Sequence, residues 1–161
     1  MAEPELILTI GVYGKSSEAF FGALKEACVD TFCDIRLRRG VRGSQYAFVN
    51  SNRLQSELAQ RHIFYRYVPE LAPTQRIREM QHEADAEAGI TKRTREELGE
   101  VFKRAYEAEI LDRFDGARFR ESLAGSRRVA FFCVEGAPGA CHRSLAASRL
   151  ARMWDVPVEH L

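Results

Sequence analysis

The chain has 161 residues, a length that fits one domain with its own hydrophobic core. Hydrophobic residues make up 45% and charged residues 29%, so disorder along the whole chain is not expected. The formal net charge is +1, and this balance by itself indicates no polyanionic partner.

No apolar run approaches the roughly 20 residues that a membrane span needs, and the N-terminus lacks the basic leader of a signal peptide. We therefore expect a cytoplasmic protein with no membrane partner. In that reducing compartment the four cysteines are expected to be thiols rather than disulfides.

Short apolar runs alternate with helical patterns through the first 70 residues. Residues 6–10 and 31–36 predict strands, and the segment between them predicts a helix whose N-cap is Ser16 or Ser17. These pieces form a predicted βαβ unit, which implies a parallel sheet. An arginine-rich loop over 37–50, a helix from about Ser51 and a third strand over 63–68 follow.

The segment from Thr74 to Glu97 is dense in charge and poor in large apolar residues. It predicts an exposed helix, a break near Gly89 and then a second helix with core spacing. Together they form an α-helical insertion over about 74–113, which we expect to pack beside the sheet. A flexible lid over the site is the alternative.

The last third of the chain contains the most apolar expected strand, over 129–134, which should be central in the sheet. A short helix over 114–123 precedes it, and a helix over 140–154 and a last strand over 157–161 follow it. Residues 1–161 thus predict a single α/β domain with three layers and a mostly parallel sheet, of the Rossmann-like or flavodoxin-like kind.

Polar or reactive groups follow nearly every expected strand. In open parallel sheets ligands bind outside the carboxyl ends of the strands, so one crevice is expected to hold these groups. They are Gly11, Tyr13 and Ser16 after the first strand, Asp34 and Arg36 after the second, Glu70 after the third, and Cys133 and Glu135 after the central one.

The strongest local signal is the stretch from Cys133 to Arg143, where a loop rich in glycine and proline runs into a helix. Free backbone N–H groups at the start of a helix suit an anion. Cys141 is expected there with a lowered thiol pKa, which makes it the preferred nucleophile over Cys133. His142 is suited to proton transfer, and Arg143 to clamping a phosphate or carboxylate.

Plainer roles exist for the same residues. Cys133 is equally well explained as a core residue at the end of an apolar strand, and Arg143 as a structural partner of Glu135 or Asp34. Because the spacing of Cys133, Cys141 and His142 does not match the common zinc patterns, no metal site is predicted, and no cofactor is named.

Four motifs, taken together, resemble the DUF488 family. They are Thr9-Ile10-Gly11, Asp34-Ile35-Arg36, Pro69-Glu70-Leu71 and Cys133-x-Glu135…Cys141-His142-Arg143. The resemblance implies a cytoplasmic α/β fold and supports these motif positions as a site, but it implies no particular reaction. Val12 stands where family members usually have His, and Ala72 where Gly is common. If that His takes part in chemistry, the chain is an altered or inactive member.

Three hypotheses from different classes follow. The leading one is an enzyme or enzyme-like domain that binds a phosphate-containing ligand, a nucleotide or nucleic acid. In it Arg36 and Arg143 hold the anion, Cys141 or Cys133 is the nucleophile, and Glu135 or His142 carries the proton. The second is a non-catalytic nucleic-acid-binding module that uses the arginines of residues 36–42 with Tyr46 and Phe48. The third is a redox or metal sensor that uses the two thiols.

Overall fold

The computed structural model describes residues 1–161 and contains one sheet of five strands, all parallel, in the order β3-β2-β4-β1-β5. The strands are β1 (Leu6–Ile10), β2 (Thr31–Asp34), β3 (Phe64–Tyr67), β4 (Arg128–Phe132) and β5 (Val158–His160). The helices are α1 (Ser17–Glu26), α2 (Ser51–Gln60), α3 (Gln75–Ala88), α4 (Glu100–Glu109), α5 (Gly116–Ser122) and α6 (His142–Trp154).

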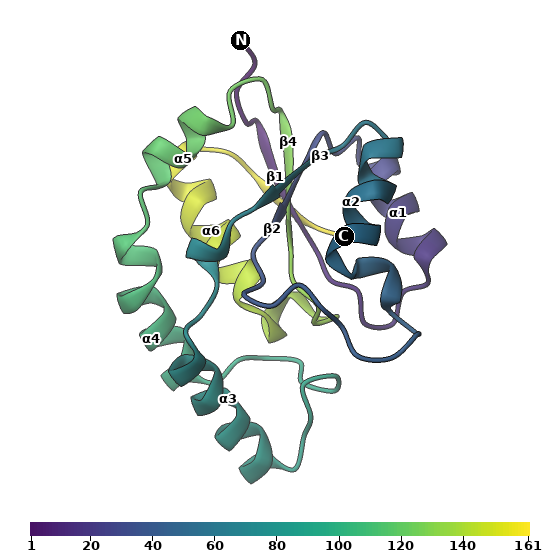
Figure 1. Cartoon of the computed structure of the whole chain (residues 1–161). Coiled ribbons are helices and arrows are strands. Elements are labelled where there is room, and N and C mark those ends of the chain that lie inside the picture. Colours follow the sequence, from purple (N-terminus) through teal and green to yellow (C-terminus); the bar gives the residue numbers. More distant parts are fainter.

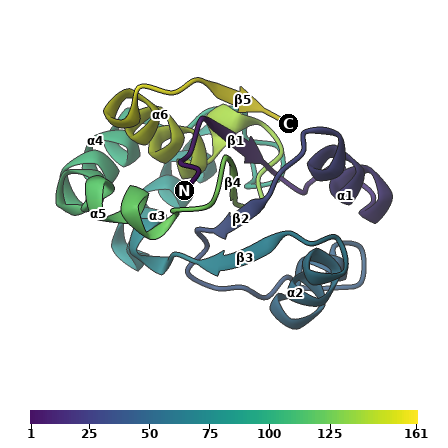
Figure 2. The same cartoon turned by 90° about the horizontal axis from the view of Figure 1, so that it is seen from above.

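Helices cover both faces of the sheet and make a three-layer α/β fold, as predicted. Figures 1 and 2 show α1 and α2 on one side and α3, α4, α5 and α6 on the other. β4 is the middle strand, which confirms its predicted central place. The predicted βαβ unit is present, since β1 and β2 are connected through α1 and run parallel in one sheet. The two strands are not adjacent, because β4 lies between them and pairs with both. This arrangement brings the end of β4 into the centre of the carboxyl edge.

Two hydrophobic cores lie on opposite faces of the sheet. Successive side chains of a strand point to opposite faces, so Leu6, Leu8 and Ile10 join the core under α1 and α2, while Ile7 joins the other. The second core also takes side chains from α3, α4, α5 and α6, including Ile77 and Phe102. The helical insertion therefore packs beside the sheet, as expected.

Local capping signals set the helix ends that the sequence predicts. Ser16 is the N-cap of α1, where its hydroxyl accepts the N–H of Ala19 at 3.1 Å. α3 ends at Gly89, whose φ of 69° lies in the left-handed region that favours glycine. None of the helices combines the length and apolar composition that crossing a membrane requires.

Replacing Phe131 with Ala tests the central place of β4. Its ring is fully buried in the second core and stacks on Phe119, with the ring centroids 6.4 Å apart. Phe131→Ala is expected to lower the free energy of unfolding by about 3–5 kcal/mol, because it leaves a cavity in a packed core. Val101→Ala, on a side chain that is 65% exposed, should change it by less than about 0.5 kcal/mol. Urea denaturation followed by circular dichroism measures both, and equal losses would contradict the assignment.

Candidate functional site

The candidate site lies where β4 ends and α6 begins. Cys133 follows β4 directly, and the connection from there to Cys141 crosses the carboxyl edge of the sheet. Cys141 is the N-cap of α6, and its sulfur accepts the backbone N–H of Arg143 at 3.5 Å. The sequence thus correctly predicts a cysteine at a helix start.

Two thiols and an imidazole meet at this point. The sulfurs of Cys133 and Cys141 and a ring nitrogen of His142 all lie within 4.8 Å of one another, and all three residues are buried. The Cys141 Sγ lies 3.7 Å from His142 Nδ1. On the other side of the ring, His142 Nε2 is 3.0 Å from the carbonyl oxygen of Ile35. A carbonyl only accepts hydrogen bonds, so the proton of the neutral ring is on Nε2.

The two thiols differ in acidity, in the opposite order to the one predicted. Burial, and then the neighbouring Cys133, raise the pKa of Cys141, and this outweighs its place at a helix start. A hydrogen bond from Cys141 and the nearby His142 lower the pKa of Cys133 despite its burial. Cys133 also lines a cavity, whereas Cys141 is fully buried. Of the two thiols, Cys133 is therefore the one that faces the cavity.

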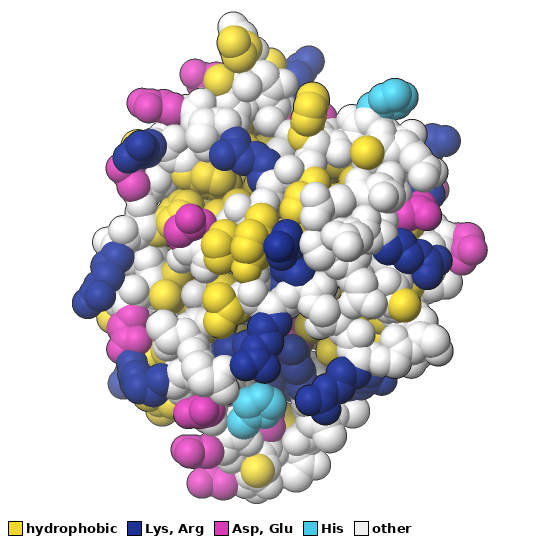
Figure 3. Space-filling model, viewed as in Figure 1, with side chains coloured by type: hydrophobic (Ala, Val, Ile, Leu, Met, Phe, Trp, Pro, Cys, Tyr) yellow, Lys and Arg dark blue, Asp and Glu magenta, His cyan; other side chains and the backbone are white.

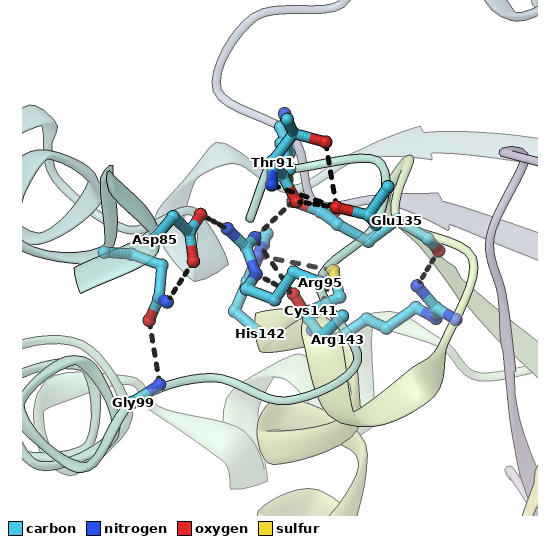
Figure 4. A network of polar contacts seen from close by, with 12 residues as sticks. Asp85, Thr91, Arg95, Gly99, Glu135, Cys141, His142 and Arg143 are labelled. Carbon is cyan, nitrogen blue, oxygen red and sulfur yellow. Dashed lines mark hydrogen bonds and ion pairs between the residues drawn. The ribbon is translucent and has the colours of Figure 1, made fainter. Parts of the chain in front are cut away.

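A buried network of charged groups joins the helical insertion to this cluster (Figure 4). Arg95 lies between two carboxylates, with Nη1 2.5 Å from Asp85 Oδ2 and Nη2 3.2 Å from Glu135 Oε1. It also donates to the carbonyl oxygen of Ala140 at 3.1 Å, just before Cys141. The other carboxylate oxygen of Glu135, Oε2, is buried and has no hydrogen-bond partner. Burial, and then Cys133, raise the pKa of Glu135.

A cavity of about 480 Å³ opens beside the cluster, and Cys133, Glu135 and His142 all line it. Seven cationic side chains share its wall with one carboxylate, that of Glu135. The seven are Arg36, Arg38, Arg42, Arg78, Lys92, Arg93 and Arg95. Figure 3 shows Lys and Arg side chains gathered in the lower middle of this face, beside α3. The cavity wall is therefore strongly cationic, in a chain whose net charge is only +1.

Asp34 and Arg36 form a buried ion pair at the end of β2. Two nitrogens of Arg36 lie 2.8 Å from the two carboxylate oxygens of Asp34, and Nη2 also donates to the carbonyl oxygen of Val49. The guanidinium lies 4.7 Å from the ring centroid of Phe132. Arg36 Nη1 is buried without a partner, on a side chain that lines the cavity. Asp34 thus orients Arg36. The Tyr65 hydroxyl donates to the Asp34 carboxylate at 2.8 Å and so helps to orient Asp34 in turn.

Arg143 does not line the cavity and is not placed to clamp a ligand, contrary to the prediction. It is fully buried, and its guanidinium donates to the carbonyl oxygens of Glu135 at 2.5 Å and Gly136 at 3.0 Å. Its partner is thus the backbone of Glu135, not the carboxylate. Gly11 lies against the same carbonyl, and a Cβ there would come 1.9 Å from the Glu135 oxygen. Both residues hold the loop after β4 instead of contacting ligand.

Comparison with known proteins gives one match. A family model, described as domain of unknown function DUF488, matches residues 16–150. The chain belongs to the DUF488 family. No curated protein and no solved structure matches it.

The remaining predicted site residues, Tyr13, Ser16 and Glu70, divide into one at the cavity and two elsewhere. Tyr13 lines the cavity and packs on Tyr46, with ring centroids 5.2 Å apart. Glu70 does not: it is exposed and borders a different hollow beside α4 and α5, because β3 is an edge strand at the far side of the sheet. Ser16 caps α1 and is likewise absent from the cavity wall.

The two departures from the family pattern are both buried. Val12 is fully buried in the core under α1 and α2, and Ala72 is also buried. Neither side chain lines the cationic cavity. The replacement of His by Val12 therefore changes the core beside the site and leaves the Cys133 cluster complete.

The sequence does not predict that side chains of the helical insertion line the cavity. Arg78, Lys92 and Arg95 line the cavity, and Gln81 holds the buried Asp85 carboxylate at 2.8 Å. The high charge of this region is itself the signal, but a solvated helix face gives the same pattern. Only the packing of α3 against the rest of the chain identifies the inward charges.

A pair of glycine-to-alanine substitutions tests the close packing of Gly11 against the Glu135 carbonyl. Gly11→Ala pushes a methyl group into the Glu135 carbonyl and should lower the free energy of unfolding by about 1–3 kcal/mol or more. Gly22→Ala, inside α1 with no atom within 4 Å of the new Cβ, should raise it by about 0.5–1 kcal/mol. Chemical denaturation of both variants measures the two signs. A Gly11→Ala protein as stable as the wild type would refute the close packing.

Proposed function

We propose that this DUF488 protein is an enzyme that binds a phosphate-containing ligand in the cationic cavity and acts on it with the Cys133 thiol. A nucleotide or a segment of nucleic acid fits this ligand class. The observation that carries the proposal is the cavity wall, where seven cationic side chains surround one carboxylate and a thiol. A polyanion is the ligand whose charge such a wall complements.

The electrostatics favour an external anion over internal pairing. Glu135 is already paired with Arg95, and Lys92 lies 3.8 Å from the same oxygen. Of the remaining cations only Arg36 has a carboxylate partner, Asp34, which does not line the cavity, and Arg36 Nη1 is still unpartnered. Arginine forks suit phosphate oxygens, and Arg36 needs little reorganisation because Asp34 already fixes it.

The proposed chemistry uses the groups beside the anion. The Cys133 sulfur bonds to an electrophilic atom of the ligand, while the bond from that atom to its leaving group breaks. The leaving group takes the electron pair and a proton, for which Glu135 and His142 are the carriers on the cavity wall. Water then displaces the sulfur and restores the thiol, so the net reaction is hydrolysis.

A non-catalytic nucleic-acid-binding role is the second candidate. Its support is the contact between the Tyr13 and Tyr46 rings, which are tilted at 53° to each other, with the Arg93 guanidinium 5.2 and 5.6 Å from the two ring centroids. Aromatic rings with arginine at the edge of a cationic groove suit stacked bases. Under this role, changes of Tyr13 and Arg93 abolish binding, whereas changes of Cys133 leave the protein fully functional.

Removing one cavity charge tests anion binding. Arg78→Ala is expected to weaken the binding of inorganic pyrophosphate by about 10-fold or more at low salt, because a charge-assisted hydrogen bond is lost. Arg152→Ala removes the same charge from an exposed position of α6 outside the cavity and should leave binding unchanged. Isothermal titration calorimetry measures both. Equal affinities of the Arg78→Ala and wild-type proteins, or no binding by the wild type, would refute the cationic site.

Alkylation tests the placement of the thiols. Iodoacetamide at about pH 8 should modify Cys133 and the exposed Cys28 in the folded protein. It should spare Cys33, because burial raises the pKa of that thiol to about 12 and keeps it neutral. Pyrophosphate should slow modification of Cys133 several-fold and leave Cys28 unchanged, as peptide mass spectrometry can measure. Faster labelling of Cys141 than of Cys133, or no protection by pyrophosphate, would overturn the assignment.

A further inference from the structure

Three donor atoms from two separate elements converge at the wall of the cavity. They are the sulfurs of Cys133, at the end of β4, and Cys141, at the N-cap of α6, together with a ring nitrogen of His142. From this geometry we infer that Cys133, Cys141 and His142 form a binding site for a thiophilic divalent cation, Zn²⁺. The inference goes beyond the proposed reaction and needs only the placement of these donors.

The separations of the donor atoms suit a tetrahedral zinc ion. With Zn–S near 2.3 Å and Zn–N near 2.0–2.1 Å, neighbouring ligand atoms of a tetrahedron lie about 3.5–3.8 Å apart. The observed distance from Cys141 Sγ to His142 Nδ1 is 3.7 Å, and no pair of the three donor atoms exceeds 4.8 Å. Shifts of about 1 Å in the donor atoms therefore complete the arrangement.

The imidazole is already oriented as a metal ligand. His142 Nε2 donates to the Ile35 carbonyl at 3.0 Å, so the lone pair of the neutral ring is on Nδ1, the nitrogen that faces Cys141. The ring also packs edge-on against Tyr106, with centroids 5.5 Å apart. Metal-binding histidines commonly give their second nitrogen to a backbone carbonyl in this way, which fixes the tautomer and the ring plane.

The surroundings select the kind of metal. Two thiolates and an imidazole are soft to intermediate donors, which favour Zn²⁺ over Mg²⁺ and Ca²⁺. The two negative sulfurs balance the charge of the dication, so the complex is tolerated beside Lys92 and Arg95. Cys133 and His142 line the cavity, whereas Cys141 lies behind them, so the metal enters from the cavity and any fourth ligand comes from that side. Three protein ligands with an open position are typical of reactive rather than structural zinc.

The spacing of these residues in the sequence does not indicate a zinc site, but the fold brings the donors close together. Zinc ligands in common motifs lie two to four residues apart, whereas seven residues separate Cys133 from Cys141. The loop between them folds back on the buried Arg143, which donates to the carbonyl oxygens of Glu135 and Gly136. The fold thus brings together three donors whose spacing in the sequence does not match a common zinc pattern.

Metal binding and nucleophilic attack are alternative states of the same sulfur. When Cys133 ligates Zn²⁺, one lone pair of the thiolate is engaged and the sulfur becomes a weaker nucleophile toward a ligand or iodoacetamide. Zinc occupancy would thus slow the thiol chemistry proposed above, while the cationic wall that holds the anion stays in place.

Cobalt titration tests the site directly. The full chain, reduced and freed of metal with a chelator, is titrated with Co²⁺ alone and followed by absorption spectroscopy. The wild type should bind one Co²⁺ with a thiolate-to-cobalt charge-transfer band and the visible bands of tetrahedral cobalt, and Zn²⁺ but not Mg²⁺ should abolish them. A wild type without these bands, or with bands that Mg²⁺ abolishes, would overturn the inference.

Serine variants identify the ligands. Cys141→Ser keeps a side chain that caps helices well, so α6 should form while Co²⁺ affinity falls by more than about 100-fold. Cys133→Ser should lose the site to the same extent, and Cys28→Ser, an exposed thiol outside the cluster, should keep it. Circular dichroism establishes folding. Retention of the charge-transfer band at full strength in folded Cys133→Ser would refute the ligand set.

Pyrophosphate binding by the same preparations separates this inference from the proposed function. Cys141→Ser should bind pyrophosphate like the wild type, since Cys141 does not line the cavity. If the wild type binds pyrophosphate but not Co²⁺, the metal-site inference is refuted and the proposed function is not. If it binds Co²⁺ but not pyrophosphate, the proposed anionic ligand is refuted and the metal-site inference is not.

Discussion

The arrangement of the site depends on one buried cation, Arg143. Its guanidinium is fully removed from solvent and is neutralised by no carboxylate, and it donates to the carbonyl oxygens of Glu135 and Gly136. Burying an arginine in this way costs free energy that only well-placed acceptors offset. The loop after β4 therefore has one favourable position, with its carbonyls on the guanidinium. That position brings Cys133 and Cys141 together, although they are eight residues apart.

The positive charge of Arg143 also reaches the groups around it. Burial, and then Arg143, lower the pKa of Lys15 on one side and of His160 on the other. Gly11 completes the arrangement, because the absence of a side chain lets β1 approach the Glu135 carbonyl. The glycine and the arginine of the DUF488 motifs thus have one joint role. They shape the backbone that carries the reactive side chains.

Arg95 holds the helical insertion in place, as Arg143 holds the loop after β4. By bonding Asp85, Glu135 and the Ala140 carbonyl at once, it fixes α3 and the segment after it against the loop between β4 and α6. The insertion is thereby a wall of the cavity, not a separate appendage. Of the two predicted possibilities, packing beside the sheet is correct, and this packing is also what supplies most of the cavity's cations.

The sequence predicts well those features that depend on neighbouring residues. The five strands, the Ser16 cap and the helix end at Gly89 follow from local periodicity and capping, and the structure contains them. It also locates Cys133 and His142 at the edge where the cavity lies. It fails for the order of the strands, since nothing local indicates that β4 inserts between β1 and β2.

The sequence also does not predict which charged side chains line the cavity and which support the backbone. Arg36 and Arg143 have the same chemistry and stand in similar motifs, yet one lines the cavity and the other lies under the loop. What separates them is the direction of each side chain after folding. The same holds for the thiols, because the helix start that should activate Cys141 also buries it completely.

The polar groups at the cavity occupy positions that folding alone does not favour. Arg36, Arg95, Glu135 and the two thiols occupy buried positions where apolar side chains of similar volume would often give a more stable protein. Two of their polar atoms, Arg36 Nη1 and Glu135 Oε2, have no partner although burial makes that costly. Folding alone gives no reason for such a concentration at one cavity. The phosphate-containing ligand proposed above would supply partners for those atoms, and the seven cations around them are the basis for proposing that it is anionic.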